Sequence, residues 1–218
     1  MIELKHVKKI FEQSVLFQDL NLTIHDKEYV VLSGKSGCGK TTILNIIGGL
    51  EKIEEGQVLV DGKDISKTRN KLKYFQNKVG FLFQNFALIE NKTVYDNLDL
   101  VYDKSRNGVS IEDALEKVGL KDKMKTKVYK LSGGEQQRIA VARLMIKKCD
   151  IVLADEPTGS LDDENGKMVM DLIDMLHKMG KTIVLVTHNE EYKTLGERVI
   201  NLSELTNLTK VNGEMHEK

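Results

Sequence analysis

A short stretch near residue 35 constrains the fold of this chain more than any other. From Gly34 to Thr42 it runs Gly-Lys-Ser-Gly-Cys-Gly-Lys-Thr-Thr, so two glycines bracket four residues and precede lysine and threonine. The apolar run Tyr29–Leu32 comes before it, and apolar residues at helical spacing follow from Ile43 to Leu50. Strand, glycine-rich turn and helix are the context of a phosphate-binding loop. The alternative, a glycine-rich turn with a chance lysine, is disfavoured by this spacing.

Each residue type in the loop suits phosphate chemistry. Glycines let the backbone turn its N–H groups inward, and the helix that follows directs its partial positive end at the same place. Lys40 is expected to reach the β- and γ-phosphates, and the hydroxyl of Thr41 to ligate Mg²⁺. The other residues expected to line the nucleotide are Gly34, Lys35, Ser36, Gly37, Cys38, Gly39 and Thr42.

Composition excludes several classes of protein. The 218 residues include 33 Lys and Arg and 33 Asp and Glu, and this balance argues against a general nucleic-acid binder. No apolar run approaches the ~18 residues that span a bilayer, and the first residues lack a secretory signal core. Cys38 and Cys149 make no disulfide framework. We therefore expect a cytoplasmic protein with no nucleic-acid partner.

The order of predicted elements indicates an α/β fold. Strands are predicted at residues 1–11, 20–24, 29–32, 57–60, 79–83, 151–154, 182–186 and 198–202. Asp61-Gly62 is a hairpin signal. Strands that alternate with helices favour a mostly parallel sheet covered on both faces.

Between residues 86 and 149 helical spacing replaces strand-like runs. Thr93 is expected to cap one helix. Ser110 is expected to open another helix through a capping box, and Gly119 to end that helix. The chain is therefore interpreted as one domain, 1–218, with a core of residues 1–85 and 150–218 and an inserted helical lobe of residues 86–149.

An acidic pair, Asp155 and Glu156, directly follows the apolar run 151–154. In open α/β sheets, ligands collect at the carboxyl ends of the strands. Nucleotide hydrolysis needs a carboxylate for Mg²⁺, which suits Asp155, and a group that orients or deprotonates water, which suits Glu156. Acidic residues also begin loops after strands without any chemical role. The phosphate loop earlier in the chain favours the functional interpretation.

A second informative stretch is Leu131–Arg138, Leu-Ser-Gly-Gly-Glu-Gln-Gln-Arg. Ser132 and Glu135 form a capping box at the start of a helix, which alone is a common feature. Gly133 and Gly134 weaken a helix, so their presence indicates that something approaches the backbone closely. Free N–H groups and a serine hydroxyl at a helix N-terminus predict a second phosphate site.

These motifs resemble, in their order along the chain, those of the ATP-binding subunits of ABC transporters. The stretches that carry the resemblance are Gly34–Thr42, Gln84, Leu131–Gln137, Ile151–Glu156, Ser160–Asp162 and His188. The resemblance covers essentially the whole chain. It implies a P-loop NTPase, RecA-like core with a β-rich edge and a helical lobe. It also implies a head-to-tail homodimer around two Mg-ATP, each held between one subunit's phosphate loop and the other's Ser132–Glu135.

The resemblance assigns further roles. It implies that Phe11 stacks on adenine, where the family usually has tyrosine, and that Gln84 touches Mg²⁺ or the attacking water. It implies that His188 contacts the γ-phosphate and that Asp162 crosses to the opposing subunit. The alternative for Phe11 is a simple core aromatic residue, and a histidine after a buried strand, taken alone, is more often a satisfied polar group.

Three stretches look like one subgroup, the macrolide-efflux, lipoprotein-release and bacitracin-resistance ATPases. They are Phe83–Ile89, Leu131–Arg138 and Ala154–Asp162. The likeness implies an ATPase on the inner face of the cell membrane that drives a separate integral permease for export of, or resistance to, a peptide, antibiotic or lipid-like substrate. One departure is Leu202–Leu205, where the family often has an acidic-glycine turn, and we expect it to affect only the edge of the fold.

Two alternatives remain open from the sequence. One is an ABC protein that acts on DNA or ribosomes, although no coiled-coil insertion or second ATPase domain is present in the sequence. The other is a regulatory ATPase that controls a membrane-anchored cell-wall enzyme system without transport.

Overall fold

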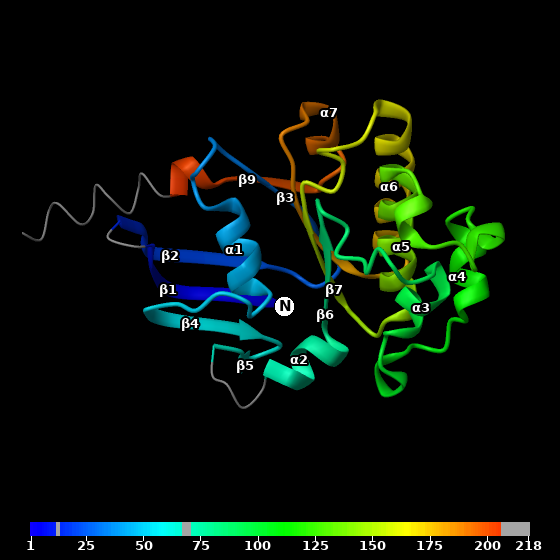
Figure 1. Ribbon diagram of the computed structural model, residues 1–218. Helices are drawn as coiled ribbons and strands as arrows, with labels where there is room; N and C mark the ends of the chain where they lie inside the picture. Colours follow the sequence, from blue (N-terminus) through cyan, green and yellow to red (C-terminus); the bar gives the residue numbers. More distant parts are fainter. Residues whose placement is uncertain (12–13, 67–70, 206–218) are drawn as a thin grey trace, which may run out of the picture. The chain divides into compact units, whose positions relative to one another are not determined.

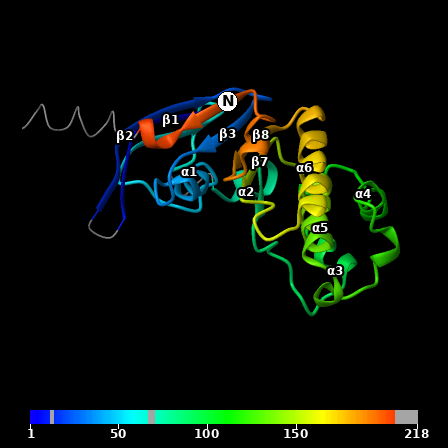
Figure 2. The ribbon, with the colours of Figure 1, turned by 90° about the horizontal axis from the view of Figure 1, so that it is seen from above.

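The computed structural model describes residues 1–11, 14–66 and 71–205. The chain forms two compact units, one of residues 1–74 with 184–218 and one of residues 75–183. Within the described ranges, no helix is both long enough and apolar enough to cross a bilayer. Figure 1 labels most of the elements, and Figure 2 also labels β8.

The first unit contains an antiparallel sheet with strand order β2-β1-β4-β5. Its strands are β1 (Ile2–Phe11), β2 (Ser14–Ile24), β4 (Glu55–Val60) and β5 (Lys63–Asp64). Along β2, Leu20, Leu22 and Ile24 are buried, as their alternation with polar residues predicts. The predicted hairpin at Asp61-Gly62 is confirmed, with φ of 50° and 72° at its two turn residues.

The same unit contains a parallel pair. Strand β3 (Tyr29–Ser33) is buried throughout and pairs with β9 (Arg198–Asn201). It leads into helix α1 (Lys40–Ile47), whose apolar face is buried. The predicted helix was too long, because the chain leaves helical geometry at Gly49, with φ of 71°, and Leu50 is 52% exposed. The short helix α7 (Glu190–Lys193) also belongs to this unit.

In the second unit, strands β6 (Val79–Phe83) and β7 (Ile151–Asp155) pair in parallel without a register shift. The unit also contains, in sequence order, the α-helices α3 (Val94–Asp99), α4 (Ile111–Lys117), α5 (Gly133–Ile146) and α6 (Asp163–Lys178). Three 3₁₀ helices lie at Asp103–Ser105, Lys121–Lys123 and Val128–Lys130. Helices α5 and α6 run side by side in both ribbon views (Figures 1 and 2).

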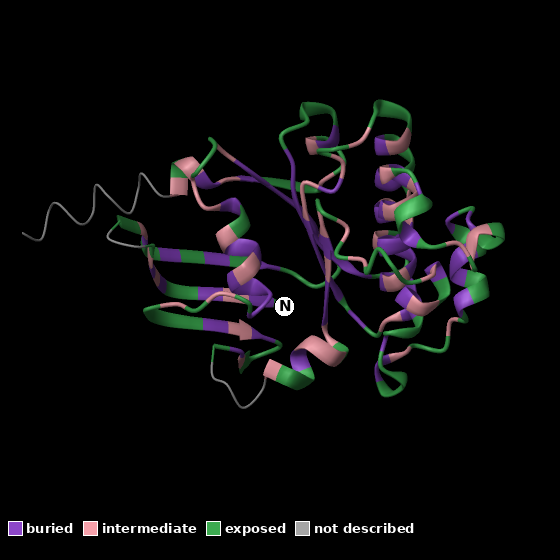
Figure 3. Ribbon diagram, in the orientation of Figure 1, coloured by how far each residue is buried: buried purple, intermediate pink, exposed green. Residues whose placement is uncertain are grey.

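Two elements span the boundary between the units. They are α2 (Lys71–Asn77), which sequence patterning did not reveal, and the buried strand β8 (Thr182–Val186), which it did. Figure 3 shows the buried residues of the strands and of the inner faces of the helices.

Most of the predicted helix ends are confirmed. Thr93 forms a full capping box with Asp96 at the start of α3. Ser110 accepts a hydrogen bond from the N–H of Asp113, which is one of the two bonds of the predicted box. Gly119, with φ of 71°, follows the end of α4.

Candidate functional site

The loop between β3 and α1 has a backbone that only glycine adopts easily. Gly34, Gly37 and Gly39 have φ of 142°, 77° and 97°. At Gly39 a Cβ atom would lie 2.4 Å from the ring of Phe17, so a side chain is excluded by space as well. The loop is therefore held in one open conformation by its glycines and by the sheet beside it.

Lys40 is the first residue of α1 and is 7% exposed. Its ammonium group donates hydrogen bonds to the carbonyl oxygens of Gly34 at 2.9 Å and Lys35 at 3.0 Å. The cation therefore lies against the loop's own backbone. Thr41, next along, is exposed in the first turn of the helix.

A residue that sequence reasoning missed contacts this loop. The N–H of Lys35 donates to the hydroxyl oxygen of Ser203 at 3.1 Å, and the N–H of Ser203 donates to the side-chain oxygen of Asn201. The signal was present as the departure at Leu202–Leu205. The expectation that this departure affects only the edge of the fold is wrong, because Ser203, just after β9, bonds to the phosphate loop.

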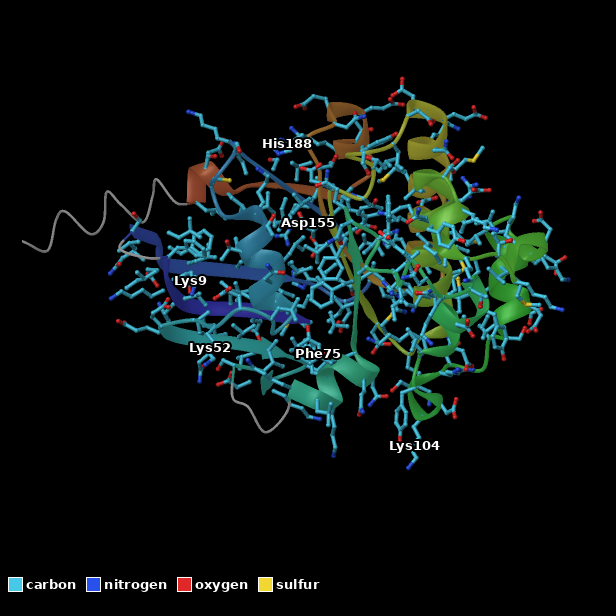
Figure 4. All side chains as sticks on the ribbon, viewed as in Figure 1. Lys9, Lys52, Phe75, Lys104, Asp155 and His188 are labelled. Atoms are coloured by element: carbon cyan, nitrogen blue, oxygen red, sulfur yellow. The ribbon has the colours of Figure 1, made fainter. Side chains whose placement is uncertain are left out.

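Two further candidates of the first unit are exposed. Phe11 ends β1 with 58% of its surface exposed, which excludes the core-aromatic interpretation. His188 lies on the surface after β8 (Figure 4). Its neighbour Thr187 is buried, and its other neighbour, Asn189, is exposed. The N–H of Asn189 donates to the hydroxyl of Thr187 at 3.1 Å, which fixes the loop that carries His188.

In the second unit, three predicted residues lie at the same end of the β6–β7 pair. Asp155, labelled in Figure 4, is the last residue of β7 and is in register with Phe83. Glu156 and Gln84 directly follow the two strands. Gln84 lies close to the loop after β7, because a Cβ atom on Gly159 would be 3.0 Å from its side-chain nitrogen. Glu156 has φ of 45°, an uncommon conformation for a residue with a side chain.

Gln137 of helix α5 ties these segments together. It is fully buried, and its side-chain nitrogen donates to the carbonyl oxygens of Pro157 at 2.7 Å and Phe83 at 3.3 Å. A single amide therefore holds the end of β6 and the loop after β7 to the helix. Sequence reasoning gave Gln137 no role, since a glutamine in a helix carries no signal alone.

The predicted capping box of α5 is confirmed. The N–H of Ser132 donates to the carboxylate of Glu135 at 2.8 Å, and the N–H of Glu135 donates to the hydroxyl of Ser132 at 3.2 Å. A Cβ atom on Gly134 would lie 2.2 Å from Asn165, whereas one on Gly133 would meet only ordinary contacts. The close approach expected at these glycines is therefore made at Gly134 by a side chain of the same protein.

Asp162 begins helix α6. Its carboxylate accepts a hydrogen bond from the N–H of Asn165 at 2.8 Å and two more from the Asn165 side chain. These bonds stabilise the charged form, so they lower the pKa of the Asp162 carboxyl below its ordinary value.

The segment after Gln84 is held in an unusual conformation. Phe86 and Ala87 have φ of 63° and 49°, and the guanidinium of Arg143 donates to their carbonyl oxygens at 3.3 Å and 2.6 Å. Burial lowers the pKa of Arg143. A partly buried cation on helix α5 thus fixes the backbone that follows β6.

The structure therefore gathers the candidates in two groups. The first unit holds Phe11, Gly34, Lys35, Ser36, Gly37, Cys38, Gly39, Lys40, Thr41, Thr42 and His188, and the second holds Gln84, Ser132, Gly133, Gly134, Glu135, Asp155, Glu156 and Asp162. The first group holds the loop between β3 and α1. The second group holds the carboxylates at the end of β7 and the residues at the starts of α5 and α6.

Comparison with known proteins gives this arrangement a context. Residues 17–159 match the family described as ABC transporter. An uncharacterised ABC transporter ATP-binding protein of Methanocaldococcus jannaschii is 38% identical over 93% of this chain and 95% of its own length. The macrolide export ATP-binding/permease protein MacB of Campylobacter fetus is 36% identical, and this chain spans 36% of its length. The methionine import ATP-binding protein MetN of Clostridium acetobutylicum is 41% identical over 91% of this chain and 65% of its own length.

Solved structures of ABC transporter cassettes are similar to this chain in fold as well as in sequence. A dimeric structure of the ABC transporter cassette MJ0796 matches 92% of this chain and 94% of its own, with a TM-score of 0.81 and 36% identity. A dimeric post-hydrolysis structure of the same cassette, bound to ADP and Pi, matches with a TM-score of 0.80 and 35% identity over the same shares of the two chains.

Proposed function

Because the chain belongs to the ABC transporter family as one of its ATP-binding ATPases, we propose that it binds and hydrolyses Mg-ATP as a head-to-tail dimer and thereby drives a separate membrane permease. The observation that carries the proposal is the loop from Gly34 to Thr42. Its glycines have positive φ, a backbone conformation that lets N–H groups turn toward a phosphate, and Lys40 places its ammonium against that backbone.

ATP binding is assigned to the first group of residues. Lys40 neutralises the β- and γ-phosphates, and the N–H groups of the loop donate to them. Phe11 stacks on adenine, a role supported by its exposure at the end of β1.

Three side chains fit Mg²⁺. A hydroxyl, an amide oxygen and a carboxylate are the hard oxygen ligands that this ion prefers, and Thr41, Gln84 and Asp155 would supply them. The ends of β6 and β7 bring the last two to one edge, and Thr41 is exposed at the start of α1. Bound with ATP, Mg²⁺ neutralises charge on the phosphate oxygens.

Hydrolysis is assigned to Glu156 and His188. Glu156 accepts the proton of the attacking water, and its left-handed backbone supports this role because strained conformations are concentrated at functional sites. His188 contacts the γ-phosphate from its exposed loop.

The second nucleotide contact comes from a second copy. Ser132, Gly133, Gly134 and Glu135 present a helix N-terminus to the ATP of the partner, and Asp162 crosses to it. The dimeric structures of MJ0796 support this assembly.

A pocket in the second unit supports the proposal of a docking surface for the permease. This pocket, of about 340 Å³, is lined mainly by apolar side chains, among them Phe75 (Figure 4) and the exposed Leu100 and Tyr102. Arg143 also lines it and holds the backbone after Gln84, which connects the pocket physically to that candidate. We assign the docking surface to the inserted helical lobe of residues 86–149, including the residues that follow Gln84.

The permease places the chain on the inner face of the cell membrane. We favour export of, or resistance to, a peptide, antibiotic or lipid-like substrate, because the stretches around Gln84 and Asp155 look like the macrolide-efflux subgroup and because the MacB relatives are named for export. The named transporters among the relatives give no support to a regulatory role without transport or to a nucleic-acid partner.

Affinity purification of the chain from membranes tests the partner. A co-purifying integral membrane protein is expected, and Leu100→Asp should abolish its recovery while Glu112→Gln, on the surface of α4, should not. Recovery of no membrane protein with the parent chain would refute the proposed coupling. Sensitivity of the deletion strain to peptide antibiotics then tests export or resistance.

A further inference from the structure

Asn165 lies where the first turns of two helices meet. It belongs to α6, and a Cβ atom on Gly134 of α5 would lie 2.2 Å from its Oδ1 and 2.7 Å from its Cβ. Such distances are far inside van der Waals contact, so only glycine at residue 134 allows this approach. This close approach lies in the first turns of the two side-by-side helices of Figures 1 and 2, next to the residues Ser132 and Asp162 that cap them.

The side chain of Asn165 bonds in both directions. Its Nδ2 donates to Oδ1 and Oδ2 of Asp162, at 3.0 Å and 2.8 Å. Its Oδ1 accepts a hydrogen bond from Nη1 of Arg138, on α5, at 2.9 Å. One amide group therefore joins the residue that opens α6 to the helix that begins at the Ser-Gly-Gly stretch.

We infer that Asn165 is a positioning residue that holds Asp162 and Ser132–Gly134 in one fixed arrangement, so that both meet the second subunit together. The inference rests on the proposed function, in which both features contact the partner across ATP. Groups that are already ordered lose less conformational entropy when two surfaces associate. Without the link, Asp162 and the N-terminus of α5 would have to be ordered separately at each closure.

The link can be removed without removing the helix cap. The backbone N–H of Asn165 also donates to Asp162, at 2.8 Å, and Asn165→Ala retains this bond. Asn165→Asp keeps the shape and the acceptor for Arg138, but it loses the donors and sets a second carboxylate beside Asp162. The two variants therefore separate hydrogen bonding to Asp162 from packing.

The test measures pairing apart from nucleotide binding. In a Glu156→Gln background, sedimentation with Mg-ATP gives the dimer constant, and fluorescent ATP titrated against dilute protein gives the affinity of the single subunit. Both Asn165 variants should bind ATP like the parent but pair about tenfold more weakly, which corresponds to about 1.4 kcal/mol. Glu164→Gln, on the exposed side of the same turn, should pair like the parent.

A variant of Arg138 and a titration of Asp162 test whether weaker pairing comes from loss of the link itself or only from a general change in structure. Arg138→Gln breaks the link from the α5 side and should weaken pairing in the same direction. In Asn165→Ala, the pKa of the Asp162 carboxyl, followed by NMR, should rise toward its ordinary value because two hydrogen bonds are lost.

The outcomes distinguish the inference from its premise. If the parent pairs and Asn165→Ala pairs equally tightly, or if Asn165→Asp equals the parent, the positioning role is overturned and the proposed function stands. If the parent itself never pairs with Mg-ATP, the proposed function fails and this inference fails with it.

Discussion

The ammonium nitrogen of Lys40 lies 2.9 Å from the carbonyl oxygen of Gly34, six residues earlier in the same loop. The bond joins the two ends of the phosphate loop through the side chain expected to bind phosphate. A phosphate oxygen would compete with two backbone carbonyls for this ammonium, and the phosphate's negative charge favours the exchange.

Lys40→Ala should therefore weaken ATP binding itself. Loss of a charged contact to the phosphates is expected to reduce affinity at least about tenfold, or about 1.4 kcal/mol. Titration with fluorescent ATP measures the effect, and Lys52→Ala, an exposed lysine of the same unit (Figure 4), should bind normally. Unchanged affinity in Lys40→Ala would place the nucleotide elsewhere.

Glu156→Gln should bind ATP but slow its hydrolysis by about 10²–10⁴, the usual contribution of a positioned base. The amide keeps the size of the side chain, so the left-handed backbone at this residue needs no change. An ATP-bound dimer should accumulate in gel filtration. Steady-state turnover equal to that of the parent would remove Glu156 from the proposed role.

Alkylation of Cys38 should inhibit the ATPase, and ATP should protect against it, because this half-buried thiol lies inside the phosphate loop. Cys149 is a matched internal control. It is 3% exposed, and burial raises the pKa of its thiol, so it should react slowly. Full ATPase activity after stoichiometric labelling at Cys38, verified by peptide mass spectrometry, would contradict the prediction.

Gly134→Ala should destabilise the protein by about 1–3 kcal/mol, since the added methyl group overlaps Asn165 and forces the helices apart. Gly133→Ala is the matched control, because its new methyl group would meet only contacts of 3.5 Å and 3.6 Å. Thermal unfolding compares the two. Equal melting temperatures would show that the approach of Asn165 is not tight.

Glu54 gives a pH-dependent contribution to stability. The buried Lys9 (Figure 4) forms ion pairs with Glu51 and Glu54 at 3.0 Å and 3.2 Å. Although burial raises the pKa of Glu54, the N–H of Ile10 and the Lys9 ammonium lower it, and the net shift is downward. The stabilisation is therefore present above the ordinary pKa of 4.5 and is lost as the pH falls through the folded-state value.

Glu54→Gln should accordingly lower the free energy of unfolding by about 1 kcal/mol at neutral pH, a modest value because the glutamate is partly exposed. The difference from the parent should shrink as the pH falls below 4.5. Urea unfolding at several pH values measures it. Glu55→Gln, which breaks the more exposed pair with Lys8, should change little at any pH.

The sequence was most informative where residue type and local backbone depend on each other. The phosphate loop, the hairpin at Asp61 and the caps at Thr93 and Ser132 were predicted because glycine, lysine or a capping side chain is needed at a fixed spacing. The family and fold class were confirmed by the comparisons. The division into a core and a lobe, and the residue roles, stay predictions.

What escaped prediction depends on contacts between distant residues. The approach of Asn165 to Gly134 leaves no local pattern in the sequence, and the departure at Leu202–Leu205 did not identify Lys35 as the partner of Ser203, because each pair forms only when separate elements pack. Leu50 was misassigned for the opposite reason. Its spacing fits the helix, but the chain has already left helical geometry at Gly49.

The bond between Lys35 and Ser203 joins residues 168 positions apart. During synthesis, the nascent polypeptide carries the entire glycine-rich motif long before Ser203 exists, and β3 likewise waits for its parallel neighbour β9. The ribosome must therefore have made nearly all of the described chain before this loop gains its last backbone contact. Competence to capture nucleotide should consequently appear late in biosynthesis.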